Sequence, residues 1–402
     1  MTATRIVRGA TIAAAVALWV VLALLLWRTK VPDGLRLPHL DENAVFGRDL
    51  VHRAERYERV LDLFWLGATL TQLAVLLVLA RRGRRLVRGL GLGPVNAGIV
   101  AGVVVLTITW AAGLPWVVAT AWWERRHGVS YESYAATLAS AFVALLGTTL
   151  LAFVALAIIL GYAKVLGRSW WLAVVPTIVV IAAVLQFAFP YLATIGTHPL
   201  RNPELKAQIA RLGRRYDAGN PPIRVEKVSD RTRAANAYAV GLGPSERVVF
   251  WDTLLTEFTP REIRFVAGHE LAHLARDHLL KAVGWIGLFT LPILGVVALV
   301  TERRGGLRDP ANVPLGLFVL TVVTLAASPL RNEISRRYET EADWTALGGT
   351  RDPAAARGLF TGFARRSLQD PTPPGWVRVF LDDHPTPLQR IELARAWALR
   401  NR

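Results

Sequence analysis

The chain has 402 residues, 53% of them hydrophobic, with 47 Lys and Arg against 30 Asp and Glu. The absence of Cys excludes disulfide frameworks and thiolate metal sites, so metal ligands must be His or carboxylate. The net charge of +17 does not indicate a nucleic-acid-binding protein, because the basic residues are scattered through loops without interleaved aromatic residues. In a membrane protein such an excess more often marks loops beside anionic lipid.

Seven apolar runs indicate a polytopic membrane protein, because a helix of about 20 apolar residues crosses a bilayer. The runs are residues 10–27, 61–80, 95–118, 138–160, 170–189, 282–300 and 313–327. The last run is short, and a buried helix is the alternative there. The first run follows Arg5 and Arg8 as a signal peptide would, but it is too long and lacks a small-residue cleavage site. We interpret it as a retained span.

The distribution of charge leaves the orientation in the membrane open. With seven spans, most Lys and Arg fall on the side that holds the C-terminal residues. Many of them lie in long segments, however, which count little under the positive-inside rule. The densest cluster in a short loop lies on the other side, at Arg81, Arg82, Arg84, Arg85 and Arg88.

After the fifth run, a polar region begins at residue 197. Asn202 and Pro203 are typical of a helix start. Short strands are predicted at residues 223–228, 237–240 and 247–251, and the last two form a hairpin. An edge strand there would let an extended peptide pair with the protein, as an endopeptidase requires. A hairpin that only packs against its neighbours is the alternative.

The central motif lies in residues 259–281, where Thr259, Pro260 and Glu262 predict a capped helix start. Further along, His269-Glu270-Leu271-Ala272-His273 forms an H-E-x-x-H pattern. On a helix, imidazoles four residues apart lie on one face within reach of a single Zn²⁺. Glu270 lies beside that face and can take a proton from water. A buried helix that contains these residues by chance is the alternative.

His278 is left out of this predicted site. It follows His269 by nine residues, which is half a rotation away on a continuous helix, so the two imidazoles could not share one metal ion.

A zinc site with two His ligands needs a third protein ligand and a free position for water. Pro329 is expected to begin a helix on which Glu339 and Asp343, four residues apart, share one face. Glu339 is the preferred third ligand, with Asp343 as the hydrogen-bonding partner of a ligand His. Glu333 and Glu341 are the competing carboxylates.

Residues 351–402 are predicted to be helical and outside the membrane, with a Pro-rich break at 371–375. Thr386 and Gln389 predict a second capped helix start, and His384 lies just before it. A His in a capping loop is usually structural, but in a protease it could also steady an oxyanion.

Together these motifs resemble the CaaX prenyl protease type 1 family of integral-membrane zinc metalloproteases. The shared order is five spans, a polar region ending in H-E-x-x-H, two spans, an E-x-x-x-D helix and an H-P-x-x-x-x-R segment. The residues that carry the resemblance are 230–255, 269–273, 338–343 and 384–391.

The resemblance implies one Zn²⁺ per chain, held by His269, His273 and Glu339. It also implies that Glu270 acts as the general base and that His384 helps to stabilise the tetrahedral intermediate. The expected activity is hydrolysis of peptide bonds near the C-terminus of prenylated proteins or peptides.

The resemblance further implies that Asn236, Ala237 and Tyr238 lie on the edge strand that holds the substrate backbone. Asp343 and Arg390 would brace the site by pairing with each other.

The implied fold is mainly α, with seven transmembrane helices forming a ring around a chamber, a gluzincin-like protease domain and a small β-hairpin. We predict spans one to five in residues 1–196, the zinc protease region in 197–281, spans six and seven in 282–329, and a helical part with the third ligand in 330–402. The zinc site would face the chamber and the cytoplasm, and the residue usage is typical of a bacterial cell membrane protein.

The expected partners are a peptide or protein substrate, with or without a lipid, and membrane lipid; nucleic acid is not expected and the oligomeric state is not predicted. A heat-shock-type quality-control metalloprotease is the first alternative, although its four spans fit less well than five runs before the zinc helix. A zinc-binding membrane sensor or scaffold without catalysis is the second.

Overall fold

The computed structural model describes residues 3–401, which are mainly helical. In chain order the elements are α1 (Ala3–Trp27), α2 (Glu42–Phe46), α3 (Arg48–Arg81), α4 (Gly83–Val87), α5 (Pro94–Arg126), α6 (Tyr134–Leu166), η1 (Gly167–Ser169), α7 (Trp170–Ala193), β1 (His198–Pro199), α8 (Pro203–Tyr216), β2 (Ile223–Glu226), β3 (Ala237–Val240), η2 (Gly243–Ser245), β4 (Arg247–Trp251), α9 (Asp252–Glu257), α10 (Pro260–Ala275), α11 (His278–Glu302), η3 (Pro310–Asn312), α12 (Val313–Thr350), α13 (Pro353–Ser367), α14 (Gly375–Phe380) and α15 (Pro387–Arg400).

The apolar runs of the sequence all lie in helices. Among the described residues, five segments are long and apolar enough to cross a membrane: Arg48–Arg81, Pro94–Arg126, Tyr134–Ala193, His278–Glu302 and Pro310–Thr350. The third of these contains both α6 and α7, and a shorter apolar stretch, Ala13–Trp27, ends α1. A polytopic membrane protein is therefore confirmed, while the count of seven spans stays a prediction.

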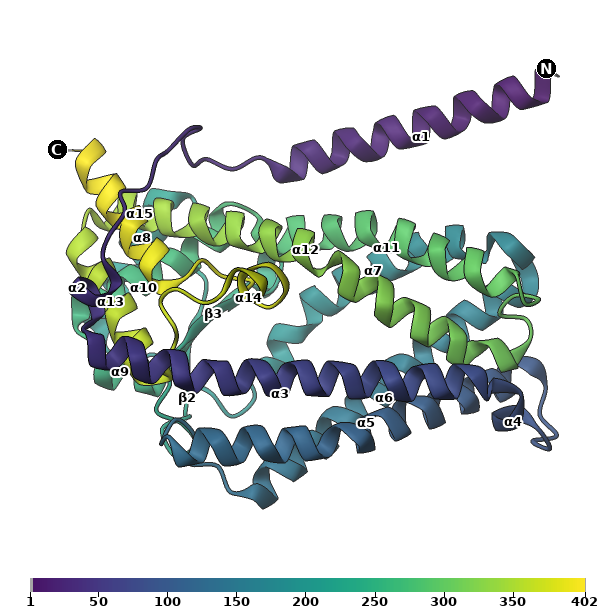
Figure 1. Cartoon of the computed structure of the whole chain (residues 1–402). Helices are drawn as coiled ribbons and strands as arrows, with labels where there is room; N and C mark the ends of the chain where they lie inside the picture. Colours follow the sequence, from purple (N-terminus) through teal and green to yellow (C-terminus); the bar gives the residue numbers. More distant parts are fainter. Residues whose placement is uncertain (1–2, 402) are drawn as a thin grey trace.

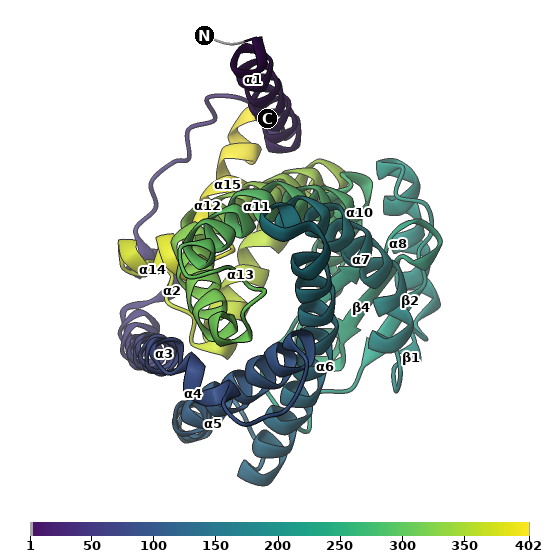
Figure 2. The same cartoon turned by 90° about the vertical axis from the view of Figure 1, so that its right-hand side faces the viewer.

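The long helices run side by side and close a ring. Neighbouring helices in contact are α3 with α5, α5 with α6, α6 with α7, α7 with α11, α11 with α12, and α12 with α3 (Figures 1 and 2). Helix α1 lies outside this ring and packs against α11, where the Trp19 indole donates a hydrogen bond to the Leu288 carbonyl at 3.0 Å. In the structure the ring is thus closed without α1, and only the count of seven spans stays a prediction.

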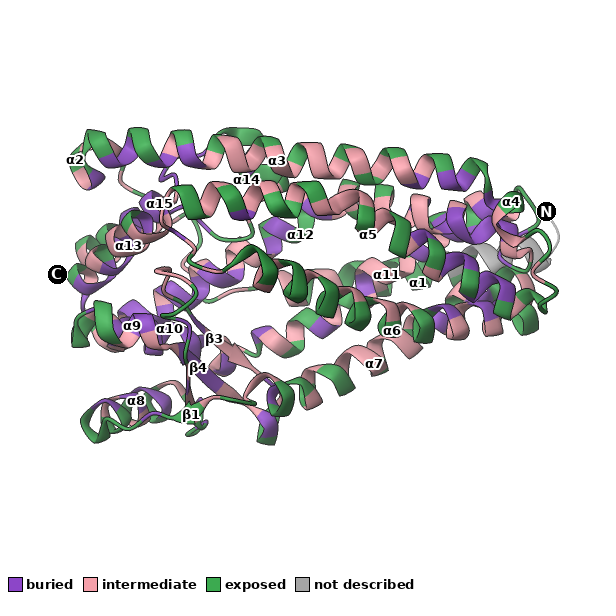
Figure 3. Ribbon diagram, turned by 90° about the horizontal axis from the view of Figure 1, so that it is seen from below, coloured by how far each residue is buried: buried purple, intermediate pink, exposed green. Residues whose placement is uncertain are grey.

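Many large apolar residues of these helices are exposed, and Figure 3 shows that exposed and half-buried positions run along most of the length of the long helices. Val143, Leu150 and Val180 are examples on α6 and α7, each more than half exposed. An apolar surface of this extent is unfavourable in water and matches contact with lipid chains.

Helix α12 is one continuous helix of 38 residues. The expectation that Pro329 begins a new helix is therefore wrong, because Pro329 lies inside α12. A Pro is tolerated within a membrane helix where neighbouring helices and polar side chains compensate for its missing N–H group. As a result, the apolar segment and the segment that carries Glu339 form a single element.

The protease region contains a small sheet with strand order β1-β2-β4-β3 within the described residues. Strand β3 is antiparallel to β4, which confirms the predicted hairpin, and β2 is parallel to β4. On its other side β3 pairs with no strand in the described part of the chain, so it is an edge strand. It packs against α10, and Phe250 of the neighbouring strand β4 belongs to the same core cluster as Phe265 and Leu271 of α10.

Helix α10 begins as predicted and ends earlier than expected. Thr259 and Glu262 form the capping box, with the Thr259 side chain accepting the Glu262 N–H. The helix ends at Ala275, Asp277 takes a left-handed conformation with φ +55°, and α11 begins at His278. The assumption of a continuous helix through residue 281 is therefore wrong, and His278 does not lie where its spacing indicated.

A buried carboxylate ties α10 to the start of α13. Asp352 is only 5% exposed; it caps α13 by accepting the Ala355 N–H at 3.0 Å, and Arg261 donates two hydrogen bonds to it, each of 2.7 Å. Burial raises the pKa of Asp352, but these hydrogen bonds outweigh burial and hold it below its usual range.

Replacing Asp352 by Ala is expected to lower the melting temperature, since losing a helix cap costs about 1 kcal/mol. A carboxylate with a depressed folded-state pKa stabilises the protein above its unfolded-state pKa, and this stabilisation is lost as the pH falls through the folded-state pKa. The melting temperatures of wild type and Asp352→Ala in detergent should therefore converge between about pH 7 and pH 3. A difference that is constant across this range would contradict a contribution from the charge.

Candidate metal centre and active site

The structure brings together the three residues predicted to hold a metal ion. His269 and His273 on α10 and Glu339 on α12 each offer one ligand atom, and these atoms lie within 4.8 Å of one another. The two Nε2 atoms are 3.0 Å apart. Glu339 Oε2 lies 3.2 Å from Nε2 of His269, and Oε1 lies 3.4 Å from Nε2 of His273.

The outer nitrogen of each imidazole has a hydrogen-bond partner inside the protein, and these partners decide which ring nitrogen carries the proton. Nδ1 of His269 lies 2.9 Å from Asp343 Oδ1, and Nδ1 of His273 lies 3.0 Å from Nδ1 of His278. When each Nδ1 carries the proton, both Nε2 atoms turn lone pairs toward each other and toward Glu339. Glu339 Oε2 is buried and accepts no hydrogen bond from any described residue. These facing acceptors fit a cation, and two neutral imidazoles with a carboxylate are a donor set typical of Zn²⁺.

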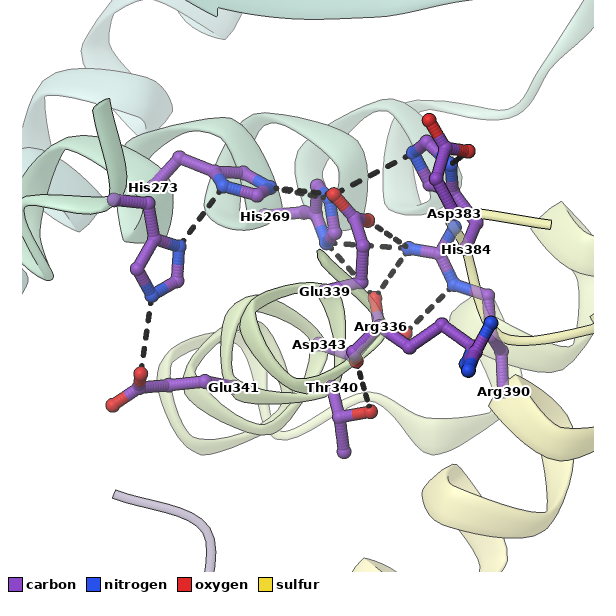
Figure 4. A network of polar contacts seen from close by, with 11 residues as sticks. His269, His273, Arg336, Glu339, Thr340, Glu341, Asp343, Asp383, His384 and Arg390 are labelled. Atoms are coloured by element: carbon purple, nitrogen blue, oxygen red, sulfur yellow. Dashed lines mark hydrogen bonds and ion pairs between the residues drawn. The ribbon is translucent and has the colours of Figure 1, made fainter. Parts of the chain in front are cut away.

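Asp343 and Arg390 form an ion pair, and Asp343 also contacts His269 (Figure 4). The guanidinium of Arg390 donates from Nε to Oδ2 and from Nη2 to Oδ1, both at 2.7 Å. It also lies over the Phe360 ring, 4.2 Å from the ring centroid, so both packing and hydrogen bonding fix its position. A carboxylate that accepts the outer N–H of a ligand His fixes the tautomer and the ring orientation.

Glu270 is buried in the same cleft, 7% exposed. Burial raises its pKa to about 7, although His269 and a hydrogen bond from the Ala239 backbone N–H act in the opposite direction. A carboxyl group with a pKa near neutrality can both take and return a proton.

His384 lies at the rim of the site, with its side chain 52% exposed. Its Nε2 is 3.5 Å from Glu339 Oε1, and its Nδ1 is 2.7 Å from Asp383 Oδ1. Burial of the ring lowers the pKa of His384, but Asp383 and Glu339 outweigh it and raise the pKa above its usual value. When it is protonated, the ring is a hydrogen-bond donor that faces the metal group.

The edge strand β3 borders the same cleft, which has a volume of ≈ 490 Å³ and is lined by Asn236, Ala237 and Tyr238 together with the metal group. The Asn236 carbonyl accepts the Trp251 N–H at 3.0 Å, so Asn236 faces β4. Because backbone groups alternate along an antiparallel strand, Ala237 and Ala239 direct theirs outward. The Tyr238 hydroxyl donates to Glu226 Oε2 at 3.2 Å.

Sequence reasoning missed several residues of this site. Leu359, Phe360 and Phe363 of α13 form an apolar wall of the cleft, and no motif marks them. His278 contacts His273, and Glu341 contacts His278. The competing carboxylate Glu341 therefore does not touch the metal group directly; His278 lies between it and His273. Glu333, the other competitor, instead pairs with Arg336 at 2.7 Å. The turn at Asp277 is what brings His278 back, and an Arg-Asp-His string does not predict a left-handed residue.

Several known proteins are similar in sequence to parts of this chain. An uncharacterized metalloprotease of Bacillus subtilis, YhfN, is 29% identical over 240 residues, 56% of this chain and 56% of the relative. A protease HtpX homolog of Methylibium petroleiphilum is 30% identical over 178 residues, 39% of this chain and 63% of the relative. A CAAX prenyl protease 1 homolog of Dictyostelium discoideum is 30% identical over 152 residues, 35% of this chain and 36% of the relative. The chain thus spans about a third to two thirds of these curated relatives.

The fold is similar to that of the crystal structure of S. mikatae Ste24p, with a TM-score of 0.74, 20% sequence identity and coverage of 95% of this chain and 97% of that chain. The fold is that of a polytopic membrane protein, and α10 carries the H-E-x-x-H motif that is typical of zinc metalloproteases. Residues 199–398 match the family model of Peptidase family M48, and over these residues the chain belongs to that family.

Proposed function

We propose that this protein is a membrane-embedded zinc endopeptidase. The observation that carries the proposal is the convergence of His269, His273 and Glu339 in one cleft with the buried Glu270 and an edge strand. Zinc bound there would polarise the scissile carbonyl and lower the pKa of an attacking water molecule. Glu270 accepts the proton of that water and returns it to the leaving amine.

The remaining residues position the substrate. An extended peptide pairs with the outward N–H and carbonyl of Ala237 and with the outward carbonyl of Ala239 on β3, while the Ala239 N–H remains hydrogen-bonded to Glu270. His384 donates a hydrogen bond to the carbonyl oxygen as negative charge develops on it. Asp343 and Arg390 hold the ring of His269 in place throughout. We place the metal centre on the cytoplasmic side of a bacterial cell membrane, in keeping with the many basic residues on that side.

A substrate with a lipidated C-terminus is the favoured class, because the fold resembles Ste24p and a relative is named for CAAX prenyl proteolysis. A quality-control protease that cleaves membrane proteins without lipid is the second candidate. It is favoured by the several relatives named protease HtpX homolog.

A pair of peptides separates these two candidates. The purified protein in detergent is given a farnesylated C-terminal peptide and its unprenylated twin, each with and without a zinc chelator. Cleavage of the farnesylated peptide alone, lost on chelation, would establish the lipidated substrate class. Equal cleavage of both would favour the quality-control role. No cleavage of either by protein that binds zinc stoichiometrically would contradict the proposed activity on these substrates and favour a non-catalytic sensor or scaffold.

Replacing Ala237 by Pro is expected to lower kcat/KM by about 10- to 100-fold, since it removes one outward N–H from the edge strand. Zinc content should be unchanged, because Ala237 is not part of the metal group. Steady-state cleavage and metal analysis of the same preparation measure both quantities. Ala237→Ser is the control that keeps the N–H group and should cleave as wild type does. Equal activity of the Pro and Ser variants would show that substrate does not pair there.

A further inference from the structure

A second buried network lies on the side of His273 that faces away from the metal position. His278 and Glu341 are 4% and 1% exposed. His278 Nδ1 lies 3.0 Å from His273 Nδ1, and His278 Nε2 lies 3.1 Å from Glu341 Oε2. The imidazole of His278 also stacks on the Tyr338 ring, with centroids 4.5 Å apart and an interplanar angle of 7°. The ring can therefore neither tilt nor leave its place without disrupting this packing.

His273, His278 and Glu341 form a row of hydrogen-bonded side chains, here called the His row, and only one arrangement of protons satisfies every contact in it. Glu341 accepts a hydrogen bond, so the Nε2 atom of His278 carries a proton and its Nδ1 atom is an acceptor. The Nδ1 atom of His273 must then donate to it, which leaves Nε2 of His273 free to bind a metal ion. The carboxylate of Glu341 thus sets the tautomer of a ligand from two residues away, whereas Asp343 does so for His269 directly.

The other oxygen of Glu341 is held by the N-terminal part of the chain. Residues 28–41, here called the strap, connect α1 to α2. The backbone N–H of Lys30 in the strap donates to Glu341 Oε1 at 2.6 Å. Beside it, the Tyr338 hydroxyl donates to the Leu26 carbonyl at 2.6 Å, and the Arg337 guanidinium lies 4.4 Å from the Trp27 ring. The end of α1 is thus fastened to the turn of α12 that carries Glu339.

We propose that Glu341 and His278 form a hydrogen-bonded relay that fixes the tautomer and orientation of the ligand His273, and that the strap backbone at Lys30 is part of this relay. The proposal rests on the proposed zinc site and adds positioning residues to it. Helix α1 then contributes to the metal centre through its connection to the strap.

The substitution Glu341→Gln tests the relay with almost no change of shape. Because the Lys30 N–H requires an acceptor, the amide oxygen of Gln stays with the strap and its NH₂ group faces His278. Nε2 of His278 must then accept a hydrogen bond from this NH₂ group, so the proton of His278 lies on Nδ1. That N–H group faces the Nδ1–H group of His273, and two donors cannot form a hydrogen bond. We expect zinc affinity, measured by competition with a chelator, to fall by about 10- to 100-fold.

A second variant, His278→Phe, keeps the stacking on Tyr338 but removes the acceptor, and we expect a loss in the same range. With Co²⁺ in place of zinc, both variants should change the visible absorption spectrum, which reports ligand geometry. Lys30→Pro removes the backbone N–H, whereas Lys30→Ala retains it, so the former alone should weaken zinc binding, by less than Glu341→Gln does.

The matched control is Glu392→Gln. Glu392 is also a buried carboxylate that accepts a backbone N–H from the strap, that of Leu40 at 3.0 Å, but it does not contact the His row. The Glu392→Gln substitution should leave zinc affinity and the Co²⁺ spectrum unchanged. Equal losses in Glu392→Gln and Glu341→Gln would overturn the relay, because general loosening of the strap would explain both.

The outcome for the relay is separate from that for peptide cleavage. Wild-type affinity, within about twofold, in both Glu341→Gln and His278→Phe would overturn the relay while leaving a cleaving wild type intact. A wild type that binds zinc but cleaves no peptide would contradict the proposed function, and weakened zinc binding in the variants would still support the relay. A wild type that does not bind zinc would overturn both.

Discussion

Replacing Glu270 by Gln is expected to lower kcat for peptide cleavage by about 10²- to 10⁴-fold while leaving zinc bound. Gln has nearly the same shape as Glu and can still accept the Ala239 N–H that reaches this position. It cannot take a proton, however, so water is no longer activated for attack. Single-turnover cleavage and metal analysis of the same preparation give the two quantities.

The control for this variant is Glu333→Gln, which alters the competing carboxylate on α12. Glu333 pairs with Arg336 and does not line the cleft that contains the metal group. The Glu333→Gln protein should cleave peptide at the wild-type rate. A Glu270→Gln protein with full activity would remove Glu270 from the mechanism, and a Gln variant that has lost zinc would assign it a role in the metal group instead.

The second large effect is expected at Asp343. Replacing it by Leu leaves the guanidinium of Arg390 buried without its carboxylate and His269 without its hydrogen-bond acceptor. Breaking a buried pair by removing one partner costs about 3–5 kcal/mol, and losing the partner of a ligand His weakens metal binding by about 10- to 100-fold. Thermal melting of the metal-free protein and chelator competition measure these two losses separately.

A double variant separates the two roles of Asp343. With Arg390→Met added, no charge is left unpaired, and the Met side chain can pack on the Phe360 ring that Arg390 covers. Stability should largely return, because replacing both partners of a buried pair is often nearly neutral. Zinc affinity should stay low, because His269 still lacks its acceptor. If zinc affinity returned together with stability, Asp343 would act only through the pair with Arg390.

Sequence reasoning was most successful where a motif and a helical period act together. The H-E-x-x-H spacing and the four-residue spacing of Glu339 and Asp343 each place side chains on one helix face, and tertiary packing then brings the two faces together. Capping residues were equally informative, since Thr259 and Thr386 begin their helices as predicted. These signals are local, and local geometry decides them.

The remaining features depend on tertiary packing. The left-handed turn at Asp277 brings His278 to His273, and no residue pattern marks that turn. Pro329 is a helix-breaking signal in water, but neighbouring helices accommodate it inside α12. The contact between Lys30 and Glu341 joins residues 311 positions apart, so only the folded chain reveals it. The assigned roles of the site residues stay predictions until the variants above are measured.

The continuity of α12 has a consequence for how the protein is made. The ribosome completes α10, with both imidazoles, before it reaches α11 and α12. Glu339 becomes available only when α12 has been synthesised, and it lies on the same helix as the last long apolar segment. The metal centre therefore cannot be completed before that apolar segment has been synthesised. The proposed activity therefore requires α12, and a nascent chain that ends before Glu339 has only two of the three residues of the metal group.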